Sequence, residues 1–466
     1  MDPSQLPAGL NVVLDEDVKV DPMARSIVGG TPLRVLRLSA RGAEVLAALQ
    51  EGATPAWTPA IGRLLRTLVD AGMAHPQPAE ADAAVDWVVP ILDGADRIDP
   101  GLPPGATVVH DGGPNGARLA DRCADGEWRL VSFAENRGPA VARNEGAALG
   151  MADFVAFMDT GVALPPDSVA TLVGHFADPQ VGAVAPRVQS EPTPGLVGRF
   201  EATRSPLDLG GRPSEVRPDG RVAHVPTALL IVRRSALEEV GGFDASLRYG
   251  EDVDLVWRLR AAGWSVRYEP NIVATHPPRA SWRTLWRQRS SYGSAAAALD
   301  RRHPGAVAPV RLNVWSLVTW LLLVAGRGPL RILGAGVGVA STAALARRLD
   351  GVVSDPDATA IRLGGRGTLL AGRWLGQATG RAWLPIAAGL ALLTRRPGPF
   401  AVALMAPSAL EWFEDRPDID LLRWTALRVA EDTAYCHGVW TGMTAERSLR
   451  AIRPELTGIP GLDDDR

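Results

Sequence analysis

The chain has 466 residues, of which 22% are charged and 46% hydrophobic, and its 49 Lys and Arg residues nearly balance its 52 Asp and Glu residues. Because one domain usually takes ~150 residues, this length suggests about three domains, and the apolar fraction is high enough to exclude a disordered chain. The charge balance gives no sign of nucleic acid binding, and none is expected. Two cysteines far apart in sequence, Cys123 and Cys436, predict neither a disulfide framework nor a zinc site and fit a cytoplasmic location. The first residues lack the charged and apolar segments of a secretory signal, so we expect none.

Residues 1–80 have the pattern of a small winged-helix-like module. Apolar and polar residues partly alternate over residues 10–20 and again over 26–38, around a glycine pair, which predicts short antiparallel strands. Ser39 is a suitable N-cap for a first helix, and a second, amphipathic helix ends before Gly72. The positions expected to face the core of the module are Val45, Leu46, Leu49, Ile61, Leu64, Leu65, Leu68 and Val69.

The proline-containing segment 75–84 is expected to be a linker, and residues 84–305 then show the alternation of an α/β domain. Short β-rich segments recur between helical or turn-rich ones, which favours a doubly wound, mostly parallel sheet. In such sheets the ligands bind at the carboxyl ends of the strands. The expected strands are 86–92, 106–109, 128–133, 154–158 and 181–185.

Residues 306–466 are expected to be helical, with long apolar segments separated by arginines. These segments, 312–326, 332–346, 382–394 and 397–410, are each shorter than the ~20 residues of a simple bilayer span. Two interpretations stay open, a buried helical bundle and a membrane-associated region, and we take interfacial association as the expectation. Arginines near the segment ends would suit anionic headgroups: Arg327, Arg331, Arg347, Arg348, Arg395 and Arg396.

Two expected strands lead into segments suited to a nucleotide. An apolar strand ends at His110-Asp111 and is followed by Gly112 and Gly113. The acid could accept hydrogen bonds from a base or ribose, and the glycines would let the backbone approach a ligand; an ordinary Asp-Gly turn is the alternative. After the next strand, a turn at Gly138 begins a helix whose amides face the same sheet edge. With Arg137 and Arg143 this helix start is a reasonable site for a diphosphate, unless both arginines are surface residues.

Two further segments deliver acids. The strand before Asp159 could place this carboxylate against a divalent cation that bridges the two phosphates of a sugar nucleotide; an Asp that only caps a helix or forms a turn is the alternative. A second segment runs Gly241-Gly242-Phe243-Asp244 and then Gly250-Glu251-Asp252. Glu251 and Asp252 begin a helix, where the dipole favours ionised carboxylates, and one of them could take the proton of an attacking hydroxyl. The alternative is that these acids only cap the helix and pair with Arg258.

In this order the four segments resemble the family 2 glycosyltransferases of the GT-A fold, over residues 84 to about 305. The resemblance implies that Pro90, Asp93 and Asp111 contact the nucleotide and that Asp159 is the first acid of the DxD metal motif. It also implies that Asp252, beside Glu251, is the catalytic base and that His276 completes the metal site.

The chain departs from the family pattern at two positions. His110 replaces the first of two acids, and Gly161 replaces the second acid of DxD. Loss of a carboxylate should weaken binding of Mg²⁺ or Mn²⁺ unless His276 and diphosphate oxygens supply enough ligands. Arg287 and Arg289 could offset this loss by donating to the diphosphate.

Nearly the full length resembles the glycosyltransferases of mycofactocin biosynthesis, through the N-terminal module, the segment Arg204–Gly210 and the segment Ala434–Trp440. This resemblance implies transfer of glucose from a UDP donor to a small redox compound made from a ribosomal peptide, extended as a β-linked glucan. It also implies that residues 1–80 bind a precursor peptide, as an added β-strand, or pathway enzymes.

The predicted reaction is a single displacement with inversion, because the site offers a base and no enzyme nucleophile. One alternative is a non-catalytic sugar-nucleotide or peptide-binding scaffold of the same pathway, which the changes at His110 and Gly161 motivate. A further alternative is a membrane polysaccharide synthase, but it would need several full-length bilayer spans, and the short apolar segments argue against it. We expect a cytoplasmic protein at, or embedded in, the inner face of the cell membrane.

Overall fold

The computed structural model describes residues 2–114, 116–165, 167–279 and 281–458. Packing groups the chain into two compact units. The first contains Met1–Val20, Ile27–Pro194 and Glu201–Pro278, and the second contains Asp21–Ser26, Gly195–Phe200 and Arg279–Arg466. Residues 1–80 thus belong largely with the α/β sheet, and the second unit begins near residue 279, earlier than the boundary at 305 that the sequence suggests.

The N-terminal module contains the two predicted helices, α1 (Ala40–Gln50) and α2 (Pro59–Asp70). Ser39 caps α1, as predicted, by accepting a hydrogen bond from the Gly42 amide. The predicted core positions are buried except Leu64, which is partly buried. The short strands are β1 (Asn11–Leu14), β2 (Lys19–Asp21), β3 (Ser26–Gly29), β4 (Arg34–Arg37) and β5 (Ala74–Gln77).

The start of the predicted linker is wrong, because β5 occupies Ala74–Gln77 and pairs antiparallel with β1. Pro76 lies opposite Val12 in this two-stranded sheet. A proline without an amide hydrogen is tolerated there, since only one side of the strand is paired. The extended connection to the next strand therefore begins after Gln77.

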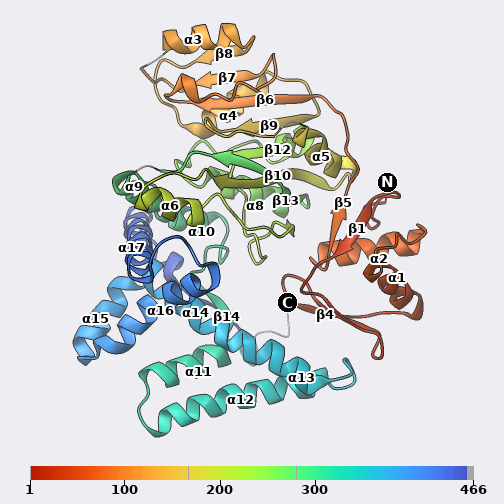
Figure 1. The fold of residues 1–466 in the computed structure, drawn as a ribbon, viewed down its shortest axis with the longest axis vertical. Helices are drawn as coiled ribbons and strands as arrows, with labels where there is room; N and C mark the ends of the chain where they lie inside the picture. The colour runs from red at the N-terminus through yellow and green to blue at the C-terminus, as the bar shows by residue number, and fades with distance from the viewer. Residues whose placement is uncertain (1, 115, 166, 280, 459–466) are drawn as a thin grey trace. The chain divides into compact units, whose positions relative to one another are not determined.

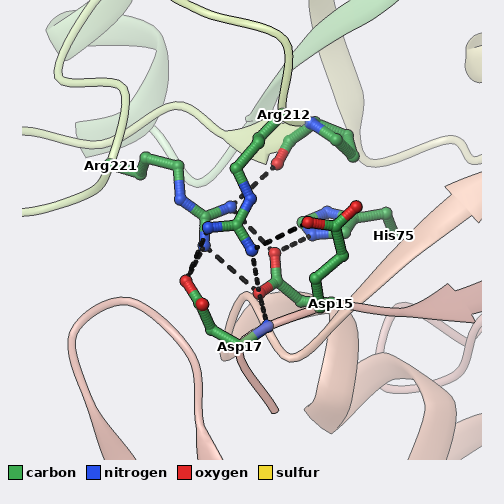
Figure 2. Close-up of polar contacts among 7 residues, drawn as sticks. Asp15, Asp17, His75, Arg212 and Arg221 are labelled. Carbon is green, nitrogen blue, oxygen red and sulfur yellow. Dashed lines mark hydrogen bonds and ion pairs between the residues drawn. The ribbon is translucent and has the colours of Figure 1, made fainter. Parts of the chain in front are cut away.

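Ion pairs join this module to the α/β part of the first unit. Arg66 of α2 forms a buried, two-pronged pair with Asp178, with nitrogen–oxygen distances of 2.9 and 2.8 Å. A second cluster, drawn in Figure 2, places Asp15 against His75 and Arg221. Burial alone would raise the pKa of Asp15, but hydrogen bonds from His75 and Arg221 hold that pKa well below its usual range. These ion pairs thus fix the N-terminal module against the α/β part of the first unit.

An eight-stranded sheet forms the centre of the first unit, in the order β11-β13-β10-β12-β9-β6-β7-β8. Figure 1 shows most of these strands side by side. β6 to β9 are mutually parallel, β10 is parallel to β13, and β12 runs antiparallel between β9 and β10. The strands are β6 (Val85–Ile91), β7 (Thr107–His110), β8 (Arg129–Ser132), β9 (Phe154–Met158), β10 (Val181–Ser190), β11 (Ser214–Glu215), β12 (Leu229–Arg233) and β13 (Ser265–His276).

This sheet confirms the predicted α/β class with a mostly parallel sheet. Because only β11 and β12 run against the others, the loops after β6, β7, β8, β9 and β13 meet at one edge. Helices flank the sheet; α4, for example, packs on β6 and β7, and α8 packs on β13. The helical segments up to α8 are η1 (Ala95–Arg97), α3 (Gly116–Asp125), α4 (Pro139–Ala148), α5 (Ser168–Gly174), η2 (His175–Ala177), α6 (Leu196–Arg204), α7 (Arg234–Glu239) and α8 (Glu251–Ala261).

The second unit is almost entirely helical. A short parallel pair, β14 (Arg311–Asn313) and β15 (Glu455–Thr457), joins its first and last parts. Its helical segments are α9 (Trp282–Ser294), α10 (Ala296–Arg302), α11 (Val314–Ala325), α12 (Pro329–Leu349), α13 (Pro356–Ala360), the π-helical η3 (Ile361–Gly365), α14 (Arg366–Arg381), α15 (Leu384–Thr394), α16 (Pro397–Asp415), α17 (Leu421–Glu446) and η4 (Arg450–Ile452).

Glycines allow α9 and α17 to cross at very short range. A Cβ atom added at Gly438 would lie 2.0 Å from the Ser290 carbonyl oxygen, and one at Gly442 would lie 2.3 Å from that of Ser294. The Ser290 hydroxyl also donates to the Ala434 carbonyl at 2.9 Å. This crossing explains why α9 groups with the C-terminal helices.

One apolar segment is longer than the sequence suggests. The segment expected at 332–346 belongs to α12, a helix of 21 residues, because residues at both ends, including Arg331 and Arg347, continue it. Among the described residues, α12 is the one helix long and apolar enough to cross a bilayer, by length and composition alone.

Candidate active site

The loops after β7 and β8 are held together by Asp111. This buried carboxylate accepts hydrogen bonds from the Arg137 amide at 2.6 Å, the Gly138 amide at 2.9 Å and the Asn136 side chain at 3.0 Å. Gly112 fits closely against the same loop, because an added Cβ would lie 2.3 Å from the Glu135 carbonyl carbon. Asp111 therefore shapes the turn that leads into α4, at the sheet edge where the sequence places the nucleotide.

The remaining predicted nucleotide contacts lie next to this turn. Pro90 is opposite Val109 in the parallel β6–β7 pair, and Asp93 follows two residues after β6. The Asp111 amide donates to the Ile91 carbonyl at 2.7 Å, which joins the two loops. The structure thus brings Pro90, Asp93, Asp111 and the Arg137-Gly138 turn to one edge. His110 accepts a hydrogen bond from the Gly113 amide at 3.0 Å and so supports the same loop.

A buried arginine, Arg143 of α4, links the two acidic segments. Its guanidinium lies 2.8 Å from Asp159 Oδ1 and 2.8 Å from Glu251 Oε1. The sequence predicts that Arg143 faces a diphosphate, whereas the structure gives both ends of its guanidinium to protein carboxylates and leaves the residue 4% exposed. Its placement therefore favours a positioning role, because it sets the distance between Asp159 and the start of α8.

Glu251 and Asp252 begin α8 after Gly250, whose φ of 80° is suited to glycine. Burial and the neighbouring Asp252 raise the pKa of Glu251 to about 7, against the opposing effect of Arg143. Burial also raises the pKa of Asp252. Asp252 Oδ1 accepts a hydrogen bond from the Val253 amide at 2.8 Å. A carboxylate in this state could accept a proton from a hydroxyl group.

The Gly-Gly-Phe-Asp segment before α8 is fixed from two sides. Asn144 of α4 forms a pair of 2.8 Å hydrogen bonds with the backbone of Phe243. Arg258 pairs with Asp254 at 2.7 Å and donates to the carbonyls of Val240 and Gly242. Arg258 thus takes Asp254 as its ion-pair partner, which argues against the interpretation that Glu251 and Asp252 are its partners.

Asn144 is the residue that the sequence motifs missed. The sequence feature that could have indicated its role is its position directly after Arg143 in the same helix. The two neighbouring side chains hold the two ends of one loop: Asn144 holds Phe243, and Arg143 holds Glu251. Helix α4 therefore determines where the α8 acids lie relative to Asp159.

The Asp159 loop lies beside the end of β13, which carries His276. The backbones of Ala163 and Thr275 exchange two hydrogen bonds of 2.9 Å. Gly161 and Pro277, each two residues away from this pair, also lie close together: a Cβ added at Gly161 would lie 3.2 Å from Pro277 Cδ. Gly161 has a φ of 86°. Gly161, at the position where the family pattern has the second acid of DxD, thus has a left-handed backbone and limited space for a side chain, both of which favour glycine.

The fit of a metal ion to these residues is partial. Among the described residues, no group of three or more His, Cys, Asp or Glu side chains is arranged to hold one. Asp159 and His276 come from adjoining segments and would need further oxygen ligands. This donor set suits a cation held jointly by protein and phosphate oxygens, as Mg²⁺ often is, rather than by a protein cage.

Two predicted phosphate ligands belong to the second unit. Arg287 is exposed on α9. Arg289 is 3% exposed, and its Nε lies 2.6 Å from Glu431 of α17. The Arg289 guanidinium is thus paired within the helical packing, whereas the sequence predicts that it donates to a diphosphate.

Comparison with known proteins gives consistent similarities. The model of glycosyl transferase family group 2 matches residues 154–353. The pre-mycofactocin glycosyltransferase of Mycobacterium tuberculosis is 34% identical, over 98% of this chain and the whole of that protein. The poly-beta-1,6-N-acetyl-D-glucosamine synthase of Staphylococcus aureus is 25% identical over 39% of this chain and 45% of its own. Among solved structures, a mannosyltransferase from Pyrobaculum calidifontis, in complex with GDP-mannose and Mn²⁺, has a TM-score of 0.37 and 19% identity, covering 63% of this chain and 89% of its own.

Proposed function

Because the chain belongs to glycosyltransferase family 2, in the group of the pre-mycofactocin glycosyltransferases, we propose that it transfers glucose from UDP-glucose to a small peptide-derived redox cofactor, with inversion. Repeated transfer would build a β-linked oligosaccharide. The observation that carries this proposal is the gathering of Asp159, Glu251 and Asp252 around Arg143, at the sheet edge that also holds the Asp111 loop.

The proposed reaction is one displacement. The acceptor hydroxyl gives its proton to Asp252 as its oxygen bonds to the anomeric carbon from the face opposite the diphosphate. The bond from that carbon to the phosphate oxygen breaks, and its electron pair leaves with UDP. A base is most effective when its pKa approaches the working pH, so the raised pKa of Asp252 supports this role.

Glu251 is proposed to support the base rather than to react. Arg143 holds one of its oxygens, and its pKa of about 7 makes its charge sensitive to the surroundings. When Glu251 is protonated, Asp252 has one fewer negative neighbour. Glu251 thus provides a means of adjusting the basicity of Asp252.

A divalent cation, Mg²⁺ or Mn²⁺, would be held by Asp159 and His276 together with diphosphate oxygens. Such an ion supplies charge neutralisation for a departing diphosphate. With two protein ligands, its affinity should depend strongly on the bound nucleotide. A chelator titration with and without UDP tests this, because equal metal affinity in both conditions would contradict the shared site.

The test of the catalytic assignment is Asp252→Asn, with Asp153→Asn as its matched control. Asp153 directly precedes β9, at the end of the strand opposite to Asp159, and it is exposed. Loss of a general base costs about 10²–10⁴-fold in rate. We expect sugar transfer to fall in that range for Asp252→Asn and to stay unchanged for Asp153→Asn. Transfer at the wild-type rate by folded Asp252→Asn would remove Asp252 from the mechanism.

The scaffold alternative makes a different prediction. A non-catalytic protein would bind UDP without turning over UDP-glucose in the presence of any acceptor. His110 and Gly161, which motivate this alternative, each have a local structural reason in the loops described above. Mass spectrometry of products made by the purified chain separates the two functions.

A peptide partner is proposed for the N-terminal module. A hollow of about 240 Å³ lies beside β1 and is lined by side chains and backbone from β1, both helices and the loop between them. Its lining residues include Leu10, Val12, Leu49 and Trp57. Titration of a precursor-derived peptide while the fluorescence of the tryptophans is monitored tests this proposal, with Val12→Asp as the variant expected to lose the response.

A further inference from the structure

The second unit contains two adjacent apolar hairpins with an unusual charge pattern. Residues 313–349, which include α11 and α12, and residues 382–410, which include α15 and most of α16, contain no Asp, Glu or Lys. The whole chain, in contrast, has a net charge of −3. The charged residues of the two segments are Arg327, Arg331, Arg347, Arg348, Arg395 and Arg396.

These helices expose apolar side chains instead of burying them. No residue of α15 is buried, although nearly all of its residues are apolar, and Leu392 and Leu393 are 79% and 84% exposed. On α12, Ile332 and Val339 are 76% and 71% exposed. About half of the large apolar side chains found exposed in the described residues lie within 313–349 and 382–410. A helix that is apolar all round is normally buried in protein or in lipid.

The turns of the two hairpins lie together. Arg396, between α15 and α16, donates to the carbonyl of Ala325 at the end of α11, at 2.7 Å. Arg331 of α12 donates to the carbonyl of Gly326 at 3.3 Å. Arg327 and Arg395 belong to the same two turns, so the two turns that meet here contribute four arginines.

We propose that α11, α12, α15 and the first half of α16 form a docking surface for an anionic phospholipid bilayer. Apolar side chains would enter the acyl boundary while the arginines contact lipid phosphates, an arrangement that combines apolar burial with charge attraction. The inference is independent of the sugar chemistry proposed above, since it rests on the second unit alone.

The helices lie in the interface and do not cross the bilayer. Helices of 11 and 12 residues, α15 and α11, are about 17 and 18 Å long, well short of a ~30 Å hydrocarbon core. α12 is long enough, but it packs along α11, and a crossing would carry Arg327 and Arg331 through the core or leave them unpaired. In an interfacial position these arginines remain at headgroup depth.

The test is flotation of the full chain with vesicles. One set contains phosphatidylcholine alone, and the other contains an equal mixture with phosphatidylglycerol. Each arginine near an anionic surface contributes about a fivefold gain in affinity, so we expect binding to the mixed vesicles to be at least tenfold stronger. Raising salt from about 0.1 M to about 1 M should remove this difference, because it shortens the Debye length from ~10 to ~3 Å.

The variant that isolates the apolar part is Leu392→Asp with Leu393→Asp, and its control is Met151→Asp. Met151 is 91% exposed and lies in the first unit, so the control changes a comparably exposed apolar residue elsewhere. We expect the double variant to lose about a hundredfold or more in vesicle affinity and the control to bind as the parent does. Exposed sites should leave the fold intact, which circular dichroism checks.

Two results would overturn the proposal. One is equal binding of the parent chain and the double variant to mixed vesicles. The other is concentration-dependent self-association of the lipid-free chain that the double variant abolishes while the parent ignores both vesicle types, because the surface would then be an interface between copies.

Discussion

Replacing Arg143 with methionine tests whether Arg143 positions the neighbouring acids or binds the diphosphate. The substitution keeps much of the side-chain length beside Phe243 but removes both ion pairs, to Asp159 and to Glu251. Breaking a buried pair typically costs 3–5 kcal/mol, since a carboxylate is left without its counter-charge. Asp159 is 38% exposed in its side chain and can recover water, whereas Glu251 is 10% exposed and cannot. At a pH above about 8, where Glu251 is ionised, we therefore expect a loss of about 3 kcal/mol of unfolding free energy, mostly through Glu251. Nearer neutral pH the loss should be smaller, because Glu251, whose pKa is about 7, can take up a proton instead.

The measurement is urea unfolding of the parent chain, Arg143→Met and Arg143→Met with Glu251→Gln. A neutral amide does not need the guanidinium, so the added Glu251→Gln change should restore part of the stability; contacting residues commonly show coupling of about 0.5–3 kcal/mol. Arg137→Met is the control, because Arg137 is exposed at the same sheet edge and stacks on Phe133. That control should unfold like the parent. If Arg143→Met also unfolded like the parent and only weakened UDP binding, Arg143 would be a ligand of the diphosphate, as the sequence alone suggests.

Three other changes test single features. The folded-state pKa of Glu251, about 7, lies above its unfolded value, so ionisation of Glu251 disfavours folding. The unfolding free energy should therefore fall by up to about 3 kcal/mol as pH rises from ~4.5 to 7. Glu251→Gln should flatten that part of the curve of unfolding free energy against pH. Gly161→Ala should cost about 1–2 kcal/mol in thermal unfolding because of its positive φ and the nearby Pro277; an unchanged melting temperature would contradict that geometry. The pKa of Asp15 is depressed, so its contribution is present above pH ~4 and is lost as pH falls further; Asp15→Asn should therefore lower stability at pH 7, and equal stability of variant and parent there would contradict the ion-pair cluster.

The sequence predicts the positions of strand ends well, because the pattern that marks a buried strand is local. Asp111 and Asp159 each come at the end of an apolar run, and parallel pairing then places them at one edge without further information. The helices of the N-terminal module were predicted for the same reason, since capping and periodicity are properties of neighbouring residues.

The sequence is less informative about partners that are distant in the chain. Arg143 resembles a surface arginine at a helix start until Glu251, 108 residues later, is seen beside it. Arg289 is similar, since its partner is Glu431, 142 residues away. A motif records which charges are present, but only the packing decides whether a charge faces a ligand or another side chain.

The crossing of α9 and α17 has a consequence for any shortened form of this protein. The segment Ala434–Trp440 lies within α17 and lets α9 approach closely, because Gly438 has no side chain. The two helices are nearly 150 residues apart in the chain. A truncation before residue 421 would strip α9 of this support and leave the Arg289 guanidinium without Glu431. Helix α17 therefore supports α9, and a shortened form of the protein should retain it.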